Sequence, residues 1–251
     1  MPAVQLFITC LIGTFFPHVG EAVVRVLQRA GVEVHIPSGQ TCCGQPAFNA
    51  GLWDDSRKMA EHTIRTFEGL PKSLGTSEVY VVTPSGSCAH MIRHGYVELF
   101  ADDPHWLPHA QSLARRTFEF TEFLVDVLEV NDLGVQWDGK LAYHPSCHLL
   151  RGLGVDRQPR LLLSQVRGAE IIDLPEAEDC CGFGGVFSIT HPELSAEMLK
   201  RKIANLESSG SPILVTCDTG CLMHIQGGLK RQKMPQRVLH IAEVLAQTVV
   251  R

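Results

Sequence analysis

The chain has 251 residues, of which 45% are hydrophobic and 20% charged, and its formal net charge is −5. This composition is ordinary for a globular protein of one or two domains. The mildly acidic balance, without a Lys/Arg cluster, argues against nucleic-acid binding, and no uncharged apolar run approaches the ~20 residues that span a bilayer.

The first half of the chain alternates strand and helix patterns. An apolar, β-rich run over residues 4–9 predicts a strand, and a one-sided apolar pattern from Val19 to Ala30 predicts a helix. A second strand ends at Pro37, an amphipathic helix follows over residues 54–67, and a third strand covers residues 78–82. The segment "FEFTEFLVDVL" closes this half after residues 101–116.

The second half repeats the alternation. The predicted elements are a strand over 141–144, a helix over 161–166, a strand ending at Pro175, a helix over 192–206 and a strand over 213–215. Strands that alternate with helices of this length imply parallel sheets flanked by helices. The turn-rich "DLGVQWDGK" places the boundary near residues 136–139. We therefore predict an α/β protein of two tandem pseudo-repeat units, residues 1–136 and 137–251.

The cysteines repeat at a period near half the chain. Cys10, Cys42, Cys43 and Cys88 match Cys147, Cys180, Cys181 and Cys221 at offsets of 137, 138, 138 and 133 residues. The flanking segments match as well, "GQTCCGQ" with "AEDCCGF" and "VYVVTPSGSCAHMI" with "PILVTCDTGCLMHI". Self-similarity at this period indicates a duplicated unit, with an insertion at residues 101–116.

These cysteines are metal-ligand candidates. The apolar N-terminus lacks a preceding basic residue and a small-residue cleavage site, so we expect a cytoplasmic protein, in which disulfides are disfavoured. Each matched cysteine follows a predicted strand, so a quartet can gather at the carboxyl edge of one sheet. Four thiolates select a soft metal, either zinc or iron–sulfur. Adjacent cysteines are awkward for one small ion but can reach different irons of a cluster.

Local backbone features fit a bulky anionic group. The glycine after each adjacent pair, Gly44 or Gly182, allows close backbone approach. Helices that start after Cys10, Cys88 and Cys221 would point N–H groups toward negative charge. The histidines near the motifs, His90, His94, His148 and His224, are expected beside the ligands or at the surface.

The motif Cys…Cys-Cys-Gly…Cys, present twice, resembles the cysteine-rich CCG domain family, which includes the cysteine-rich subunit of heterodisulfide reductase and the iron–sulfur subunit of glycolate oxidase. The segments "GQTCCGQPAFNAG", "PSGSC" and "CCGFGG" are most similar to its lactate-utilization members. The resemblance implies tandem α/β halves with one [4Fe–4S] cluster each, which in heterodisulfide reductase is non-cubane. It implies eight metal-binding residues: Cys10, Cys42, Cys43, Cys88, Cys147, Cys180, Cys181 and Cys221.

The resemblance also implies an activity and partners. It indicates an iron–sulfur electron-transfer subunit of a multi-subunit, NAD-independent complex that oxidises L-lactate to pyruvate. The partners would be a ferredoxin-type iron–sulfur protein and a further lactate-utilization subunit. Because the sequence has no recognisable flavin site or clear general base, we expect an oxidoreductase component that carries electrons rather than the full catalytic site.

One departure from the family pattern leaves the cluster type open. The fuller motif has five cysteines per half, and only the second half offers a fifth, Cys217, because the first has Pro84 at that position. We count Cys217 as a further cofactor-binding candidate. The alternatives are a thiol/disulfide reductase subunit like heterodisulfide reductase, an iron–sulfur subunit that serves glycolate or another 2-hydroxy acid, and a zinc-binding structural protein.

Overall fold

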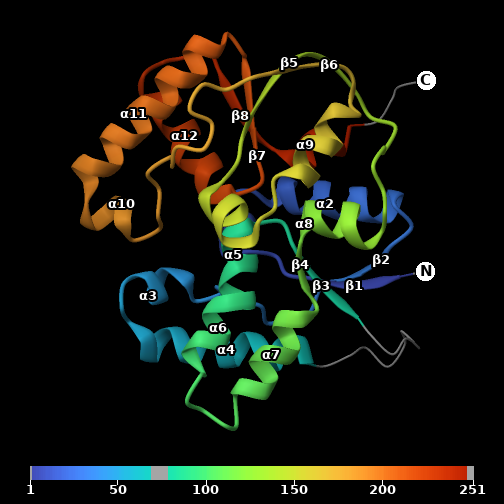
Figure 1. Cartoon of the computed structure of the whole chain (residues 1–251), viewed down its shortest axis with the longest axis vertical. Helices are drawn as coiled ribbons and strands as arrows, with labels where there is room; N and C mark the ends of the chain where they lie inside the picture. Colours follow the sequence, from blue (N-terminus) through green and yellow to red (C-terminus); the bar gives the residue numbers. More distant parts are fainter. Residues whose placement is uncertain (1, 69–78, 248–251) are drawn as a thin grey trace.

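The computed structural model describes residues 2–68 and 79–247. It contains two four-stranded sheets in which every pairing is parallel, with the strand orders β2-β1-β3-β4 and β6-β5-β7-β8 (Figure 1). The first sheet consists of β1 (Ala3–Leu6), β2 (Glu33–His35), β3 (Tyr80–Thr83) and β4 (Thr117–Glu119). The second consists of β5 (Gln136–His144), β6 (Arg167–Ile172), β7 (Ile213–Thr216) and β8 (Arg237–His240). The predicted tandem α/β architecture is confirmed.

Helices cover both faces of each sheet. In the first half they are α1 (Cys10–Phe15), α2 (Pro17–Arg29), α3 (Gln45–Asn49), α4 (Trp53–Glu68), α5 (Gly86–His90), α6 (Tyr96–Leu99), α7 (Leu107–Arg115) and α8 (Phe120–Glu122). In the second half they are α9 (Arg157–Ser164), α10 (Phe187–Thr190), α11 (Pro192–Ser209), α12 (Thr219–Arg231) and α13 (Ile241–Leu245). Within the described ranges, three π-helical turns complete the set: η2 (Met91–Gly95), η3 (Phe123–Val127) and η4 (His148–Gly152).

The elements differ from the sequence predictions mainly at their ends. β1 stops at Leu6, where the prediction ran to residue 9, and the start of the third predicted strand, residue 78, lies outside the described residues. The insertion at residues 101–116 contains α7. Among the described residues, none of the helices has the length and apolar character needed to span a bilayer.

The prediction of a turn at residues 136–139 is wrong, because these residues begin β5. A register shift lies there, since Gln136 pairs with Arg167 and Gly139 with Ala169. Gly139 has a φ of 132°, which a residue with a side chain rarely adopts, and this lets the strand continue through the irregularity. The division at residue 136 stays a prediction.

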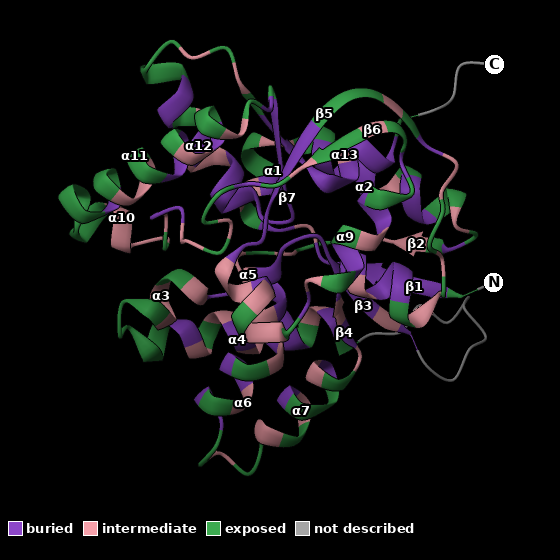
Figure 2. Ribbon diagram, turned by 45° about the horizontal axis from the view of Figure 1, so that its top comes forward, coloured by how far each residue is buried: buried purple, intermediate pink, exposed green. Residues whose placement is uncertain are grey.

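The buried core has three parts, and the central one is shared by the two halves. It joins residues such as Val23 and Phe123 of the first half to Leu149 and Val244 of the second. The outer clusters fill the other face of each sheet, against α4 to α7 in the first half and against α11 and α12 in the second. Figure 2 shows β7 buried, whereas β5 is exposed over its first part and buried toward its carboxyl end.

The halves contact each other reciprocally. α13 of the second half packs on α2 of the first, while α8 of the first half packs on α9 of the second. Likewise, α5 contacts η4 and α1 contacts α12. Because these pairs are equivalent under the duplication, the halves are related by an approximate two-fold axis. Arg29 at the end of α2 strengthens one contact by donating to the carbonyls of Leu245, Ala246 and Gln247.

Candidate metal centre

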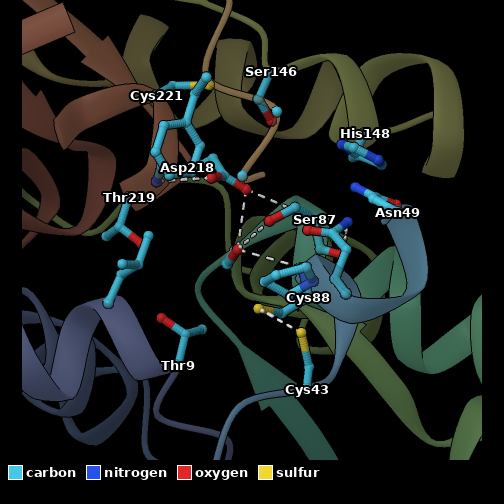
Figure 3. A pocket seen from close by; sticks show the side chains of 18 of the residues that line it. Thr9, Cys43, Asn49, Ser87, Cys88, Ser146, His148, Asp218, Thr219 and Cys221 are labelled. Carbon is cyan, nitrogen blue, oxygen red and sulfur yellow. Dashed lines mark hydrogen bonds between the residues drawn. The ribbon is translucent and has the colours of Figure 1, made fainter. Parts of the chain in front are cut away.

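Both cysteine quartets line one cavity of about 140 Å³ between the two halves. The cysteines on its wall are Cys10, Cys42, Cys43, Cys88, Cys147, Cys180, Cys181 and Cys221. In Figure 3, Cys43 and Cys88 of the first half lie on one side of the cavity and Cys221 of the second half on the other. The carboxyl edges of the two sheets therefore face one another, so that all eight matched cysteines share one space.

The first quartet is assembled from three segments. Cys10 is the first residue of α1, Cys42 and Cys43 lie in the loop after β2, and Cys88 is in the first turn of α5. The sulfurs of Cys43 and Cys88 are 3.4 Å apart. Hydrogen bonds from the Cys10 and Cys43 thiols and from the Gly44 N–H lower the pKa of Cys42 to about 3.

The second quartet repeats this arrangement. The sulfurs of Cys181 and Cys221 are 3.4 Å apart, and the N–H of Gly182 donates to the sulfur of Cys180 at 3.4 Å. Hydrogen bonds from the Cys147 and Cys181 thiols, helped by this N–H, lower the pKa of Cys180 to about 2. A soft metal binds converging cysteine sulfurs and displaces the protons that they share. The residues present therefore fit an iron–sulfur group.

The adjacent cysteines are positioned by the glycine that follows each pair. Gly44 and Gly182 have φ values of 86° and 90°. A Cβ at Gly182 would lie 2.7 Å from the carbonyl oxygen of Ser195. In return, the Ser195 hydroxyl donates to the Gly182 carbonyl at 2.8 Å, and Ser56 does the same for Gly44 at 3.1 Å. Each loop is thus held against the long helix of its own half that carries this serine, α4 or α11.

Asp218 joins the two halves at the cavity wall. Its carboxylate accepts from the Ser85 hydroxyl and the Ser87 N–H of the first half, each at 3.0 Å, and from the Gly220 N–H at 2.9 Å. It therefore caps α12 and also holds the start of α5 (Figure 3). Asp218 is not among the residues predicted from the sequence, although its position in "CDTGC" matches Ser85 in "PSGSC".

One known protein family matches the chain twice, once in each half. The cysteine-rich CCG domain matches residues 4–93 and residues 141–226. This chain belongs to the CCG family. The resemblance seen in the sequence is thereby confirmed, and each half is one CCG repeat.

Known relatives match almost the whole chain. Lactate utilization protein A from an Exiguobacterium species is 47% identical over 99% of both chains. Lactate utilization protein A 2 from Bacillus cereus is 46% identical over 97% of this chain and 98% of that protein. A solved aspartate racemase homologue from Pyrococcus horikoshii covers 98% of this chain at 11% identity, but its TM-score of 0.34 is too low to bear on function.

The ninth cysteine, Cys217 of the second CCG repeat, does not line the cavity with the other eight. Its side chain is fully buried, and its sulfur lies 3.7 Å from the hydroxyl of Tyr143. Burial raises the pKa of this thiol well above its ordinary value. Its counterpart Pro84 accepts a hydrogen bond from His240 Nε2 at 3.1 Å. The sequence candidate Cys217 is therefore placed behind the quartet rather than in it.

Three of the histidines near the CCG motifs gather where the halves meet. The ring of His90 lies 5.0 Å from that of His94 and 5.3 Å from that of His148, measured between centroids. His148 lines the cavity, and its Nδ1 is 3.6 Å from the sulfur of Cys147. His224 lies apart, with its Nε2 3.3 Å from the Ser195 hydroxyl.

Two buried residues of the second CCG repeat, His144 and Lys202, lie near the quartet but were not predicted from the sequence. His144, at the end of β5, has a ring nitrogen within 4.8 Å of the sulfurs of Cys181 and Cys221. Burial lowers its pKa to about 4, with the nearby Lys202 charge adding to the effect. Lys202 Nζ donates to the carbonyls of Glu176 and Ala177, just before the adjacent cysteines. The signal in the sequence was that the first repeat has Phe7 where the second has His144.

Proposed function

We propose that this chain is an iron–sulfur subunit of a lactate-utilization pathway, with one cluster in each half. The observation that carries the proposal is that both cysteine quartets line one cavity. Thiolate ligands in this number suit iron–sulfur clusters. Lactate utilization is supported by the names of relatives that are 47% and 46% identical to the chain.

The ligands divide between the halves. In this proposal the first cluster is held by Cys10, Cys42, Cys43 and Cys88, and the second by Cys147, Cys180, Cys181 and Cys221. When bound, such clusters, here [4Fe–4S], take up and release electrons one at a time. Because the two quartets share one cavity, electrons would cross from one half to the other over a short distance.

The remaining residues of the cavity position the ligands and offset negative charge. Cys221 lies in the first turn of α12, whose N-terminal N–H groups favour an anionic group. Asp218 fixes this end of α12 against the start of α5. The positive φ of Gly44 and Gly182 allows the loop conformation in which both cysteines of each adjacent pair line the cavity.

The oxidation itself is assigned to a complex. Oxidation of L-lactate to pyruvate releases two electrons, and the sequence has no recognisable flavin site or clear general base. We therefore propose that this subunit works without NAD, beside a ferredoxin-type iron–sulfur protein and a further lactate-utilization subunit. The disulfide-reductase alternative would gain from a fifth thiol ligand, but Cys217 lies outside the cavity.

Metal analysis of anaerobically purified protein tests the cofactor. We expect iron and acid-labile sulfide in the wild type, about half of that iron in Cys181→Ser and in Cys43→Ser, and wild-type iron in the matched control Cys217→Ser. A colourless protein that contains zinc and no iron would support the structural alternative instead. Equal iron in Cys181→Ser and the wild type would contradict the ligand assignment.

Growth tests the pathway. In a host whose own copy of the gene is deleted, we expect the wild type and Cys217→Ser to restore growth on L-lactate, while Cys43→Ser and Cys181→Ser do not. Restored growth on glycolate but not on L-lactate would point to the other 2-hydroxy-acid assignment.

A further inference from the structure

The imidazole of His144 is held in one orientation inside the second half. The side chain lies at the carboxyl end of β5 and is 1% exposed. Its Nδ1 lies 3.2 Å from the carbonyl oxygen of Ala177. A carbonyl oxygen only accepts hydrogen bonds, so Nδ1 carries the hydrogen and donates it. Lys202 donates to the same carbonyl at 3.0 Å, which fixes the acceptor in place.

The other ring nitrogen of His144 has no such partner. Nε2 is buried and makes no hydrogen bond with any described residue. A buried polar atom in this state costs free energy unless something binds it. The sulfurs of Cys181 and Cys221 are the neighbouring ligand atoms, since they and a ring nitrogen of His144 all lie within 4.8 Å of one another.

This arrangement is the one that metal-binding histidines adopt. Such a histidine almost always donates its second ring N–H to a carboxylate or a backbone carbonyl, which sets the tautomer and aims the free nitrogen at the metal. In His144 the Ala177 carbonyl has that role, and Nε2 is the nitrogen left with a lone pair. The chemistry of the site is therefore that of a mixed nitrogen and sulfur ligand set.

We propose that His144, through Nε2, is a nitrogen ligand of the metal centre in the second half, beside Cys181 and Cys221. This inference rests on the proposed iron–sulfur function. The first half has Phe7 at the equivalent position, and this ring packs 5.5 Å from that of Phe67, between centroids. Because phenylalanine cannot bind a metal, the two halves hold unlike centres, one with thiolate ligands alone and one with an imidazole.

The difference gives the two centres different reduction potentials. Histidine ligation accompanies a raised potential in Rieske iron–sulfur centres, because a neutral imidazole brings no negative charge to the metal where a thiolate would. The buried ammonium of Lys202, close to the second quartet, acts in the same direction. The second half is thus the electron-accepting end of the pair.

Isotope substitution in the unmutated protein tests the ligand. One-electron reduction changes the electron count by one, so one of the two redox states of each centre has an odd number of electrons and gives an EPR signal. We expect pulsed EPR to detect a strong nitrogen coupling that changes when the protein is made with ¹⁵N-histidine. A coupling that ignores the label, or none at all, would overturn the proposal.

Two variants locate the nitrogen. His144→Phe gives the second half the residue of the first half, and we expect it to abolish the coupling and to shift the higher of the two midpoint potentials to a lower value. His224→Met, which also introduces the first-half residue, removes a neighbouring imidazole that contacts Ser195, and should change neither. His144→Gln serves as a second variant if the phenylalanine disturbs folding, and should also abolish the coupling. Persistence of the coupling in either His144 variant would overturn the proposal.

Iron content distinguishes a failure of the nitrogen ligand from a failure of the iron–sulfur function. Wild-type protein that takes up iron and sulfide but shows no histidine coupling refutes the nitrogen ligand and leaves the iron–sulfur function standing. Protein that takes up no iron refutes both.

Discussion

The hydroxyl of Ser85 donates to the carboxylate of Asp218 at 3.0 Å, and these two residues occupy equivalent positions in the two repeats. The approximate two-fold axis therefore passes between them. Each caps the helix that carries the last cysteine of its quartet, α5 or α12. A donor facing an acceptor satisfies both caps, whereas two aspartates at these positions would bring like charges together in a buried place.

Removing the Asp218 carboxylate should destabilise the whole molecule. Asp218→Ala leaves the Ser85 hydroxyl and the Ser87 and Gly220 N–H groups without their acceptor. We expect a loss of about 3 kcal/mol in the free energy of unfolding of the metal-free protein, measured by urea titration. Ser85→Ala removes one of these bonds and the weaker cap bond from the Cys88 N–H, and should cost less, about 1–2 kcal/mol. Equal losses in the two variants would contradict a bridging role for Asp218.

Substitution of the glycine after each cysteine pair should lower the free energy of unfolding through a steric clash. This effect can be measured separately from backbone strain. Gly210 has a φ of 67° and open space where a Cβ would lie, so Gly210→Ala reports backbone strain alone, about 1 kcal/mol. Gly182→Ala adds a 2.7 Å overlap with the Ser195 carbonyl oxygen and should cost at least about 2 kcal/mol more. In Gly44→Ala the added Cβ would lie 3.1 Å from the Ser56 hydroxyl, so the loss of stability should fall between those of the other two variants. Thermal and urea unfolding of the three variants give the order, and any other ranking would contradict this steric explanation.

Glu119 should make the protein less stable as the pH rises. Burial raises the pKa of this fully buried carboxyl to about 8, against about 4.3 in an unfolded chain. Between these values the folded state keeps the proton and the unfolded state has lost it, so stability falls by up to about 1.4 kcal/mol per pH unit. Glu119→Gln retains the acceptor for the Thr121 N–H and abolishes the titration.

Urea unfolding between pH 5 and pH 8 checks the effect of Glu119. The stability of Glu119→Gln relative to the wild type should rise steadily across this range. Glu21→Gln, an exposed position on α2, controls for the loss of one negative charge. Wild type and Glu119→Gln curves that run parallel would show that Glu119 is ionised in the folded protein.

Lys202 should matter for retention of the second centre. Lys202→Met removes the Nζ donor from the Glu176 carbonyl and one of the two donors from the Ala177 carbonyl, which keeps His144, and should cost about 2 kcal/mol. We expect iron to be released to a chelator faster from this variant than from the wild type. Lys200→Met, on the exposed face of α11 beside Glu197, should change stability by no more than about 0.5 kcal/mol and leave iron release unchanged. Similar release from both variants would contradict the role of Lys202.

The fold was predictable because the same pattern of strands, helices and cysteines occurs twice in the sequence. Cys43 and Cys181, each followed by glycine and each placed after a strand pattern, located the carboxyl edges of both sheets. The fourth strand of each sheet was visible only as a matching segment. The start of β5 was misread as a turn because Gly139, a turn signal in most sequences, here absorbs a register shift.

The site was predictable only as far as spacing determines contact. Cys217 and Cys221 lie four residues apart, and the pattern of residues does not tell which one points into the cavity. The structure separates them because Asp218 begins α12 between them, so that Cys221 turns with the helix while Cys217 stays behind it. His144 escaped notice because its neighbour, the Ala177 carbonyl, is distant in sequence and is brought near only by the tertiary fold.

The unlike pair at the axis carries a consequence for the ancestry of the chain. In a symmetric homodimer of a single repeat, position 85 would face its own copy, and any substitution would occur on both sides at once. Two repeats that are encoded separately within one polypeptide can differ at this position, as Ser85 and Asp218 do. The same independence lets a phenylalanine at residue 7 and a histidine at residue 144 coexist.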